Sequence, residues 1–222
     1  RPKMCLLTYG LFSNQYDNSI LYPAMALEMF HEFTLLHDDI MDKSPLRRGK
    51  PTVWTKWSED TAILSGDVMQ IDAYKRMVKA PADKVPNVIA LFSKTAAEVC
   101  EGQQYDMEFE SVDEVKMSEY EKMIGLKTAV LLACSAAIGA IIGGADAATS
   151  QALYNYGYEL GMAFQVADDY LDAFGDEKVF GKAIGGDICN NKKTFMLINA
   201  LLRAEGDDKA ELERWIAATD FN

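Results

Sequence analysis

Apolar residues recur along most of the chain at spacings of three and four, the period of an α-helix with one buried face. No stretch alternates apolar and polar residues for long, as a half-exposed strand does. The sequence therefore predicts an all-α fold. The expected helices cover residues 1–13, 22–42, 58–80, 86–110, 118–125, 127–143, 146–174, 193–204 and a segment after Gly206. The expected loops are residues 14–19, 47–57 and 175–191.

Helix ends carry their own signals. Pro23 is expected in the first turn of the second helix, where its missing N–H costs nothing. Ser58 and Asp146 can cap the helices that follow them, because their side chains accept hydrogen bonds from free backbone N–H groups. The segment Ser118–Glu121 resembles a capping box that opens a short helix toward Gly125.

One segment, residues 128–145, runs 18 residues without a charge and is long enough to cross a membrane. Its Ala, Gly, Ser and Thr content favours a helix buried inside a bundle instead, so no membrane span is expected. The sequence thus predicts a single-domain helical bundle over residues 1–222, with functional side chains lining a deep central cavity. Since the chain begins Arg1-Pro2, we expect a piece of a longer protein, truncated at both ends.

The composition is that of a globular protein, with 49% hydrophobic and 25% charged residues. A formal net charge of −12 argues against a nucleic-acid partner, because such surfaces need clustered Lys and Arg. Four widely spaced cysteines form no CxxC motif and too few pairs for a disulfide scaffold. These features favour a reduced, cytoplasmic protein.

A cluster of acidic residues ends the second expected helix. Asp38 and Asp42 lie one turn apart on one face, with Asp39 between them. Such a pair repels itself and needs positive charge nearby. Hard divalent cations prefer carboxylate oxygens, and Mg²⁺ shares its shell with phosphate oxygens. With Arg47 and Arg48 following, the stretch points to a metal-held oligophosphate.

The same spacing of aspartates, Asp-Asp-x-x-Asp, returns 130 residues later at Asp168, Asp169 and Asp172. It again lies in a helical apolar pattern and is again followed by basic residues. One such motif is a weak signal, since acidic helix faces are usually solvated. Two facing helices that carry it would form two carboxylate walls around Mg²⁺ and a diphosphate.

Four segments, taken in order, resemble the motifs of the head-to-tail (trans) isoprenyl diphosphate synthases, the polyprenyl synthetase family. They are HDDIMDKSPLRRGKPT at residues 37–52, GLKTAVL at 125–131, FQVADDYLD at 164–172 and GKAIGGDICNNKKT at 181–194. The resemblance implies the isoprenoid synthase-like helical bundle. It implies Mg²⁺ as cofactor, as three ions that Mn²⁺ can replace. The ligands it implies are Asp38, Asp42 and Asp168, with Asp39 and Asp172 in secondary or water-mediated positions.

The resemblance also assigns the substrate contacts. Isopentenyl diphosphate and an allylic diphosphate (dimethylallyl, geranyl or farnesyl) are the implied substrates. The allylic diphosphate would be bound by Arg47, Lys127, Lys182 and Lys192. The isopentenyl diphosphate would be bound by Arg1, His31 and Arg48. Lys127 and Lys182 count among the catalytic residues, together with Thr128 and Gln165 beside the developing carbocation. A homodimer is the implied assembly.

The product is expected to grow down the second helix, away from the metals. Phe33 and Thr34 lie about 6 to 8 Å below Asp38 at roughly 1.5 Å per residue. In the family, bulky residues at this depth form the floor of the pocket. Phe33 would then limit the product to C15 or C20, with C20 favoured because Thr34 is small.

Three other classes of protein remain as alternatives. A di-iron bundle would use two Glu-x-x-His pairs, of which the chain has one, Glu28 with His31. A terpene cyclase shares the first acidic motif but usually carries another second motif than DDYLD. A non-catalytic subunit of a heteromeric synthase would be expected to lose aspartates, and both motifs here are intact.

Some residues near the motifs receive only weak assignments. Gln103 and Asp106, one turn apart, are expected to add a polar contact to the cavity. Lys178 and Lys193 are expected to be solvated or to close a loop.

Overall fold

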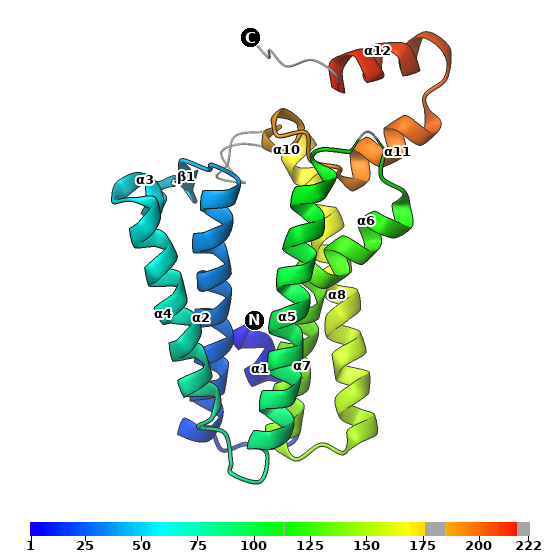
Figure 1. Cartoon of the computed structure of the whole chain (residues 1–222). Coiled ribbons are helices and arrows are strands. Elements are labelled where there is room, and N and C mark those ends of the chain that lie inside the picture. Colours follow the sequence, from blue (N-terminus) through cyan, green and yellow to red (C-terminus); the bar gives the residue numbers. More distant parts are fainter. Residues whose placement is uncertain (113, 176–184, 217–222) are drawn as a thin grey trace.

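The structure is a computed structural model that describes residues 1–112, 114–175 and 185–216. Helices make up most of it, as the sequence predicts (Figure 1). The helices are α1 Pro2–Tyr9, α2 Asn18–Met41, α3 Val53–Lys56, α4 Glu59–Met77, α5 Val85–Phe109, α6 Met117–Ile124, the π-helical turn η1 Gly125–Ala129, α7 Val130–Gly143, α8 Ala147–Phe174, α10 Gly186–Cys189, α11 Phe195–Arg203 and α12 Gly206–Ile216. A short antiparallel hairpin pairs β1 Leu46–Arg47 with β2 Lys50–Pro51.

The long helices run side by side. α2 packs along α4, while α7 packs along α8 and also contacts α5 and α1 (Figure 1). The core between them is apolar and aromatic. Phe30 and Phe92 are fully buried and meet edge to face, with ring centroids 5.3 Å apart. Leu27 and Ile138 belong to the same buried cluster, which joins the α2 side of the bundle to the α7 side.

Helix α2 begins earlier than the sequence predicts. Asp17 caps it, because the Asp17 carboxylate accepts a hydrogen bond of 2.9 Å from the Ser19 N–H. Pro23 therefore lies inside the helix rather than in its first turn, which corrects the expected position. The caps at Ser58 and Asp146 are confirmed, since they accept from the N–H groups of Thr61 and Thr149.

A break expected at Gly125 does not occur. Helix α6 passes through η1 into α7, giving one helix from Met117 to Gly143. It starts at Met117, and the carboxylate that reaches back to the start is that of Glu119, which accepts from the Lys116 N–H at 2.9 Å. This helix is apolar enough to cross a membrane, but 78% of its most apolar window is buried inside the protein. That burial is typical of a core helix and agrees with the expectation from its small residues.

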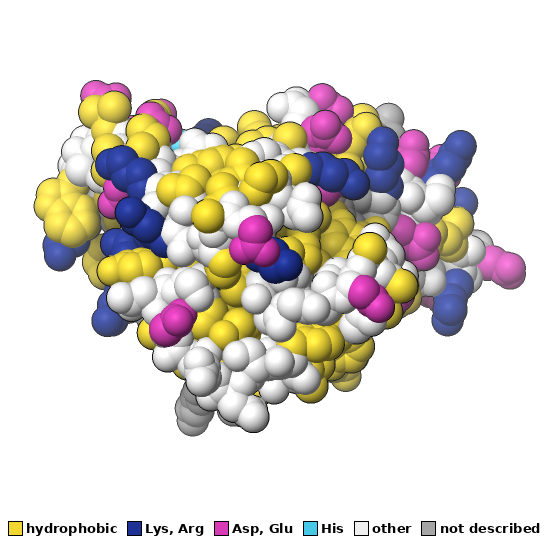
Figure 2. All heavy atoms as spheres, turned by 90° about the horizontal axis from the view of Figure 1, so that it is seen from below, with side chains coloured by type: hydrophobic (Ala, Val, Ile, Leu, Met, Phe, Trp, Pro, Cys, Tyr) yellow, Lys and Arg dark blue, Asp and Glu magenta, His cyan; other side chains and the backbone are white. Residues whose placement is uncertain are grey.

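Two expected loops contain regular structure. Residues 47–57 hold part of the hairpin and α3, and residues 175–191 hold α10. The hairpin, α3 and α10 lie at the same end of the bundle as the end of α2, together with α11 and α12 (Figure 1). Figure 2 shows the opposite end, where apolar side chains cover much of the middle and acidic ones are scattered. The acidic motifs therefore gather at one end of the molecule.

Candidate active site

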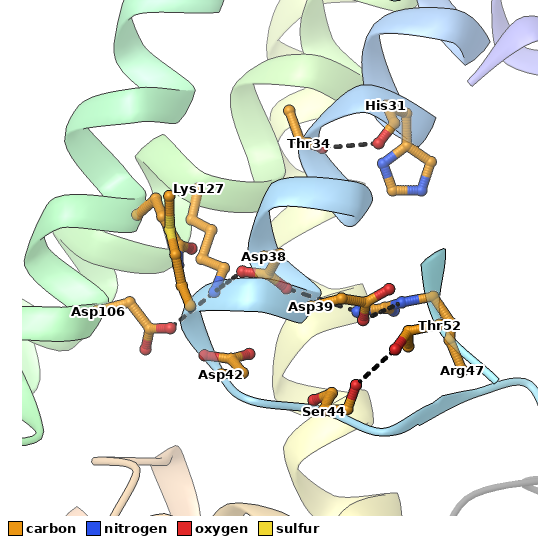
Figure 3. A network of polar contacts seen from close by, with 12 residues as sticks. His31, Thr34, Asp38, Asp39, Asp42, Ser44, Arg47, Thr52, Asp106 and Lys127 are labelled. Carbon is orange, nitrogen blue, oxygen red and sulfur yellow. Dashed lines mark hydrogen bonds and ion pairs between the residues drawn. The ribbon is translucent and has the colours of Figure 1, made fainter. Parts of the chain in front are cut away.

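The first acidic motif lies in the last turn of α2. Asp38 and Asp42 point toward α5 and η1, whereas Asp39 turns to the hairpin (Figure 3). Arg47 in β1 donates from Nε to Asp39 Oδ1 at 2.8 Å, and its Nη2 lies 3.6 Å from Asp38 Oδ2. Burial raises the pKa of Asp39 despite the guanidinium beside it. The three carboxylates thus divide between two faces of the helix.

Lys127 reaches this cluster from the π-helical turn. Its Nζ donates to Asp106 Oδ2 at 2.6 Å and to Asp38 Oδ1 at 3.3 Å. A π-turn shifts the side chains that follow it around the helix, and such turns are frequent at functional sites. Gly102 of α5 allows the backbone of this turn to come close. A Cβ at Gly102 would lie 2.6 Å from the Lys127 Cα and would overlap the Lys127 backbone nitrogen. The close approach of α5 and η1 therefore places the ammonium group.

Lys192 brings a second ammonium group to the same place. Its Nζ contacts Asp106 Oδ2 at 2.8 Å, Asp42 Oδ1 at 3.1 Å and Glu110 Oε1 at 2.7 Å. The segment before it is held by Asn191, which adopts φ 54° and donates from its amide to the Glu110 carbonyl at 3.0 Å. Lys192 is only 9% exposed, so these carboxylates replace its water shell.

Opposite charges outweigh burial in this network. Burial raises the pKa of Asp106, but the positive charges of Lys127 and Lys192 lower it by more. The pKa of Asp106 is therefore below its usual value. Burial lowers the pKa of both lysines, and the carboxylates around them raise it above the usual value. Asp42 behaves differently: burial and then Asp38 raise its pKa. Additional positive charge near Asp42 would therefore stabilise its ionised carboxylate.

The second motif lies in the last turns of α8, and its members differ. Asp169 is 4% exposed and accepts from the Tyr120 hydroxyl at 2.7 Å, the Phe195 N–H at 2.9 Å and the Gln165 amide at 3.0 Å. Its oxygens are thus used to join α6, α8 and α11. Asp172 accepts from the Asp187 N–H at 3.0 Å. Asp168 is partly exposed on the same helix, one turn before Asp172.

Asp169 also fixes the orientation of a wall residue. Its carboxylate can only accept, so the Gln165 amide nitrogen faces it and the amide oxygen faces Thr128. The Thr128 hydroxyl donates to that oxygen at 2.8 Å. The lone pairs of the Thr128 oxygen are not used in this hydrogen bond and can face a positive centre.

The three expected contacts for the second diphosphate lie near one another: His31 in α2, Arg48 in the hairpin and Arg1 at the start of the chain. Arg48 adopts φ 51° in the hairpin and is 71% exposed, with Nη1 3.8 Å from Glu32. Burial, followed by the positive charges of Arg1, Arg48 and Arg47, lowers the pKa of His31 to about 3. Burial lowers the pKa of Arg1 to about 10. A cluster of cations next to a neutral imidazole suits an anion.

The depressed pKa of His31 predicts an acid-sensitive fold. The unfolded histidine binds a proton near pH 6.5 and the folded one only near pH 3, so unfolding takes up a proton between these values. The free energy of unfolding is therefore expected to fall as the pH falls below 6.5. In His31→Asn this loss should be smaller when urea unfolding is compared at about pH 5 and about pH 7.5. An equal loss in the free energy of unfolding in both proteins would contradict a lowered pKa for His31.

Comparison with known proteins identifies the family of this chain. A model of the polyprenyl synthetase family matches residues 1–222. The chain belongs to the polyprenyl synthetase family. It is 43% identical to a geranylgeranyl diphosphate synthase of Methanosarcina mazei and 41% identical to a short chain isoprenyl diphosphate synthase of Methanocaldococcus jannaschii, over 98% and 96% of this chain. It covers 69% and 64% of those relatives, so it spans about two thirds of their length.

Solved structures of polyprenyl synthetases share the fold. A crystal structure of a geranylgeranyl pyrophosphate synthase superposes with a TM-score of 0.92 at 47% identity, covering 98% of this chain and 65% of that one. The synthetase from Pyrococcus horikoshii gives 0.88 at 38% identity, with 96% and 66% covered. The expected family and all-α fold are therefore confirmed.

The sequence analysis missed several residues that contact this candidate site. Glu110, Tyr120 and Asp169 received no role, and Asp106 received only a weak one. Polar side chains at positions 103, 106 and 110, one turn apart on an otherwise apolar helix face, are the signal that points to α5. Lys193 is 4% exposed and donates to the Asn191 side chain at 2.9 Å, so it closes its loop and is not solvated. Lys178 and Lys182 lie outside the described residues.

Phe33 and Thr34 lie on different faces of α2. At about 100° per residue, Thr34 lies about 40° around the helix from Asp38 and Phe33 about 140°. Phe33 is 7% exposed and packs on His37, next to Gly66 of α4. The Thr34 hydroxyl bonds to the His31 carbonyl at 2.7 Å. Thr34 thus shares the face of α2 that carries Asp38, whereas Phe33 fills the contact between α2 and α4.

Proposed function

We propose that this chain condenses isopentenyl diphosphate with an allylic diphosphate (dimethylallyl, geranyl or farnesyl) to give a trans-prenyl diphosphate of C15 to C20, with C20 favoured. The observation that carries the proposal is the charge cluster at the end of α2, where Lys127, Lys192 and Arg47 contact the first acidic motif. It lies at the same end of the bundle as the end of α8, which carries the second motif (Figure 1). Relatives named geranylgeranyl diphosphate synthase support the C20 product.

The donor set fits a hard divalent cation, which we take to be Mg²⁺, with three ions and with Mn²⁺ as a substitute. Carboxylate oxygens are the ligands that such ions prefer. Asp38, Asp42 and Asp168 would hold them, with Asp39 and Asp172 farther out. Among the described residues, no three His, Cys, Asp or Glu side chains form a ready metal cluster. The ammonium groups on Asp38 and Asp42 mark these oxygens as cation acceptors.

Basic side chains of the protein would bind the allylic diphosphate first. Arg47, Lys127 and Lys192 converge on the end of α2, and Lys182 completes the proposed set. Fixed cations stabilise the charge that gathers on the leaving diphosphate, and bound Mg²⁺ would neutralise it further. Arg48, Arg1 and His31 would bind the diphosphate of isopentenyl diphosphate on the hairpin side of α2.

The carbon chemistry takes place below the cations. The C1–O bond of the allylic substrate breaks, and the electron pair leaves with the diphosphate. The Thr128 and Gln165 oxygens, held by Asp169, face the resulting allylic cation. The C4 carbon of isopentenyl diphosphate then bonds to C1, and a proton passes from C2 to the departed diphosphate. The apolar walls keep water away from the cation.

An incorporation assay tests this function. The protein is incubated with geranyl or farnesyl diphosphate, Mg²⁺ and labelled isopentenyl diphosphate, and labelled prenyl products are separated by chromatography. Label in a longer allylic product is the expected result. Release of diphosphate without label would indicate a cyclase and would overturn the proposal.

A role as one component of a heteromeric synthase is the second candidate. The chain is 38% identical to a protein of Bacillus subtilis named heptaprenyl diphosphate synthase component 2, over 90% of this chain. The absence of incorporation by the isolated chain, with activity regained beside a partner subunit, would favour this reading.

Product length is expected to follow the residues below Asp38. Phe33→Ala should lengthen the product by one or more five-carbon units, because it opens space beside α4. Thr34→Phe should shorten it, because it fills the face of α2 that carries Asp38. Reversed-phase chromatography of the dephosphorylated products measures both. Unchanged lengths in both variants would show that neither residue forms the floor.

The homodimer and the cytoplasmic location also remain proposals. Helix α4 exposes Leu64, Val68 and Ile71, which are 65%, 60% and 55% exposed and share one face. Such a stripe supports pairing with a second copy. The cysteines Cys5, Cys100, Cys134 and Cys189 are all free, which supports a reducing compartment. Analytical ultracentrifugation measures the assembly directly.

A further inference from the structure

One carboxylate oxygen of Asp106 in α5 accepts hydrogen bonds from two lysine ammonium groups. Its Oδ2 accepts from Lys127 Nζ at 2.6 Å and from Lys192 Nζ at 2.8 Å. Asp106 is only 7% exposed. A buried carboxylate binds charged donors more strongly than a solvated one, because water competes less. Asp106 is therefore the fixed point at which the two ammonium groups meet.

The lysines need such a fixed point because they come from distant parts of the chain. Lys127 lies in η1, and Lys192 lies in the segment before α11. Two ammonium groups on one oxygen repel each other, and without the carboxylate between them they would separate. Glu110 contacts Lys192 alone, at 2.7 Å. Asp106 contacts both ammonium groups.

Each lysine also contacts a carboxylate of the first acidic motif. Lys127 lies 3.3 Å from Asp38 Oδ1, and Lys192 lies 3.1 Å from Asp42 Oδ1 (Figure 3). The contacts to Asp106 are shorter than these. If cations occupy Asp38 and Asp42, the lysines must give up the longer contacts, and Asp106 can keep them in place while they do.

We propose that Asp106 is a positioning residue that holds Lys127 and Lys192 beside the first acidic motif, so that both ammonium groups turn from Asp38 and Asp42 to a bound diphosphate. This rests on the proposed function, since it assumes that a diphosphate binds there. Asp106 itself touches neither substrate nor reacting atoms. Its effect is on where the two cations lie before and after the diphosphate arrives.

Asp106→Asn tests the proposal, because it keeps the size of the side chain and removes the charge. Inorganic pyrophosphate binding in the presence of Mg²⁺ is measured by calorimetry, beside the KM for the allylic substrate. Binding is expected to weaken and KM to rise by about 10-fold or more, the usual range for losing a charged hydrogen-bond partner. Asp106→Glu should recover part of the binding. Glu108→Gln, an exposed site on the same helix, should bind like the wild type.

The outcomes separate positioning from mere structure. Wild-type pyrophosphate affinity and KM in a folded Asp106→Asn variant would overturn the proposal. If Asp106→Asn does not fold, the same measurements are made on Asp106→Glu, which keeps the charge but displaces the carboxylate oxygens. Wild-type pyrophosphate affinity and KM in Asp106→Glu would overturn the proposal. Weakened pyrophosphate binding would support it. Pyrophosphate binding needs no turnover, so it can be measured even in a protein that never incorporates isopentenyl diphosphate. Such a protein would contradict the proposed function, but its pyrophosphate binding would still test the role of Asp106.

Discussion

Asp38→Asn is expected to lower kcat for incorporation of labelled isopentenyl diphosphate by about 10³-fold, the size of effect seen when one group that stabilises the transition-state charge is lost. Asp38 is the carboxylate that both Lys127 and Arg47 approach, at 3.3 and 3.6 Å. Asparagine keeps its shape but presents one neutral oxygen to a divalent cation. The leaving diphosphate would then keep more of its charge, and ionisation would slow.

The fold of Asp38→Asn should survive, because Asp38 lies at the end of α2 and not in the core. Its Tm is expected to stay within a few degrees of the wild type. Asp83→Asn is the matched control, since that carboxylate is 72% exposed and far along the chain from both motifs. A variant at Asp38 with more than about a tenth of wild-type kcat would show that the first motif does not carry the metals.

Gly102→Ala is expected to lose both stability and activity. An alanine in a helix interior normally gains up to about 1 kcal/mol over glycine. Here the new Cβ would overlap the backbone of Lys127, which cannot move as a side chain can. Overpacking typically costs about 1 to 3 kcal/mol and sometimes more, so the net effect should be destabilising. The separation of α5 and η1 should move Lys127 away from Asp106 and Asp38.

Thermal unfolding and kinetics measure the two effects at Gly102 separately. A loss of about 2 kcal/mol corresponds to a Tm lower by about 4 to 8 °C in a chain of this size. Gly66→Ala is the control, because its Cβ would meet the His37 and Phe33 side chains, which can rotate. It should be milder and should leave Lys127 in place. Unchanged Tm and kcat in Gly102→Ala would contradict the close packing of α5 on η1.

Much of the fold is legible in local patterns. The helical period predicts the long helices, and the caps at Ser58 and Asp146 follow from side chains that bond to N–H groups three residues away. The early start of α2 was missed because Asp17 caps it six residues before Pro23, and a proline usually marks the first turn of a helix. The continuity of α6, η1 and α7 was missed because Gly125 usually weakens a helix, whereas here the helix continues as a π-turn packed on α5.

The sequence by itself determined that this is an all-α polyprenyl synthetase with two acidic motifs, since one-turn spacings and motif order are properties of neighbouring residues. Only the tertiary structure decided how the charges pair. Lys127 contacts Asp38 across 89 positions, and Lys192 contacts Asp42 across 150. It also decided that Asp169 is used in packing and that Asp106 joins two lysines. Such pairings depend on which helix faces meet when the core is buried, and no local pattern encodes that.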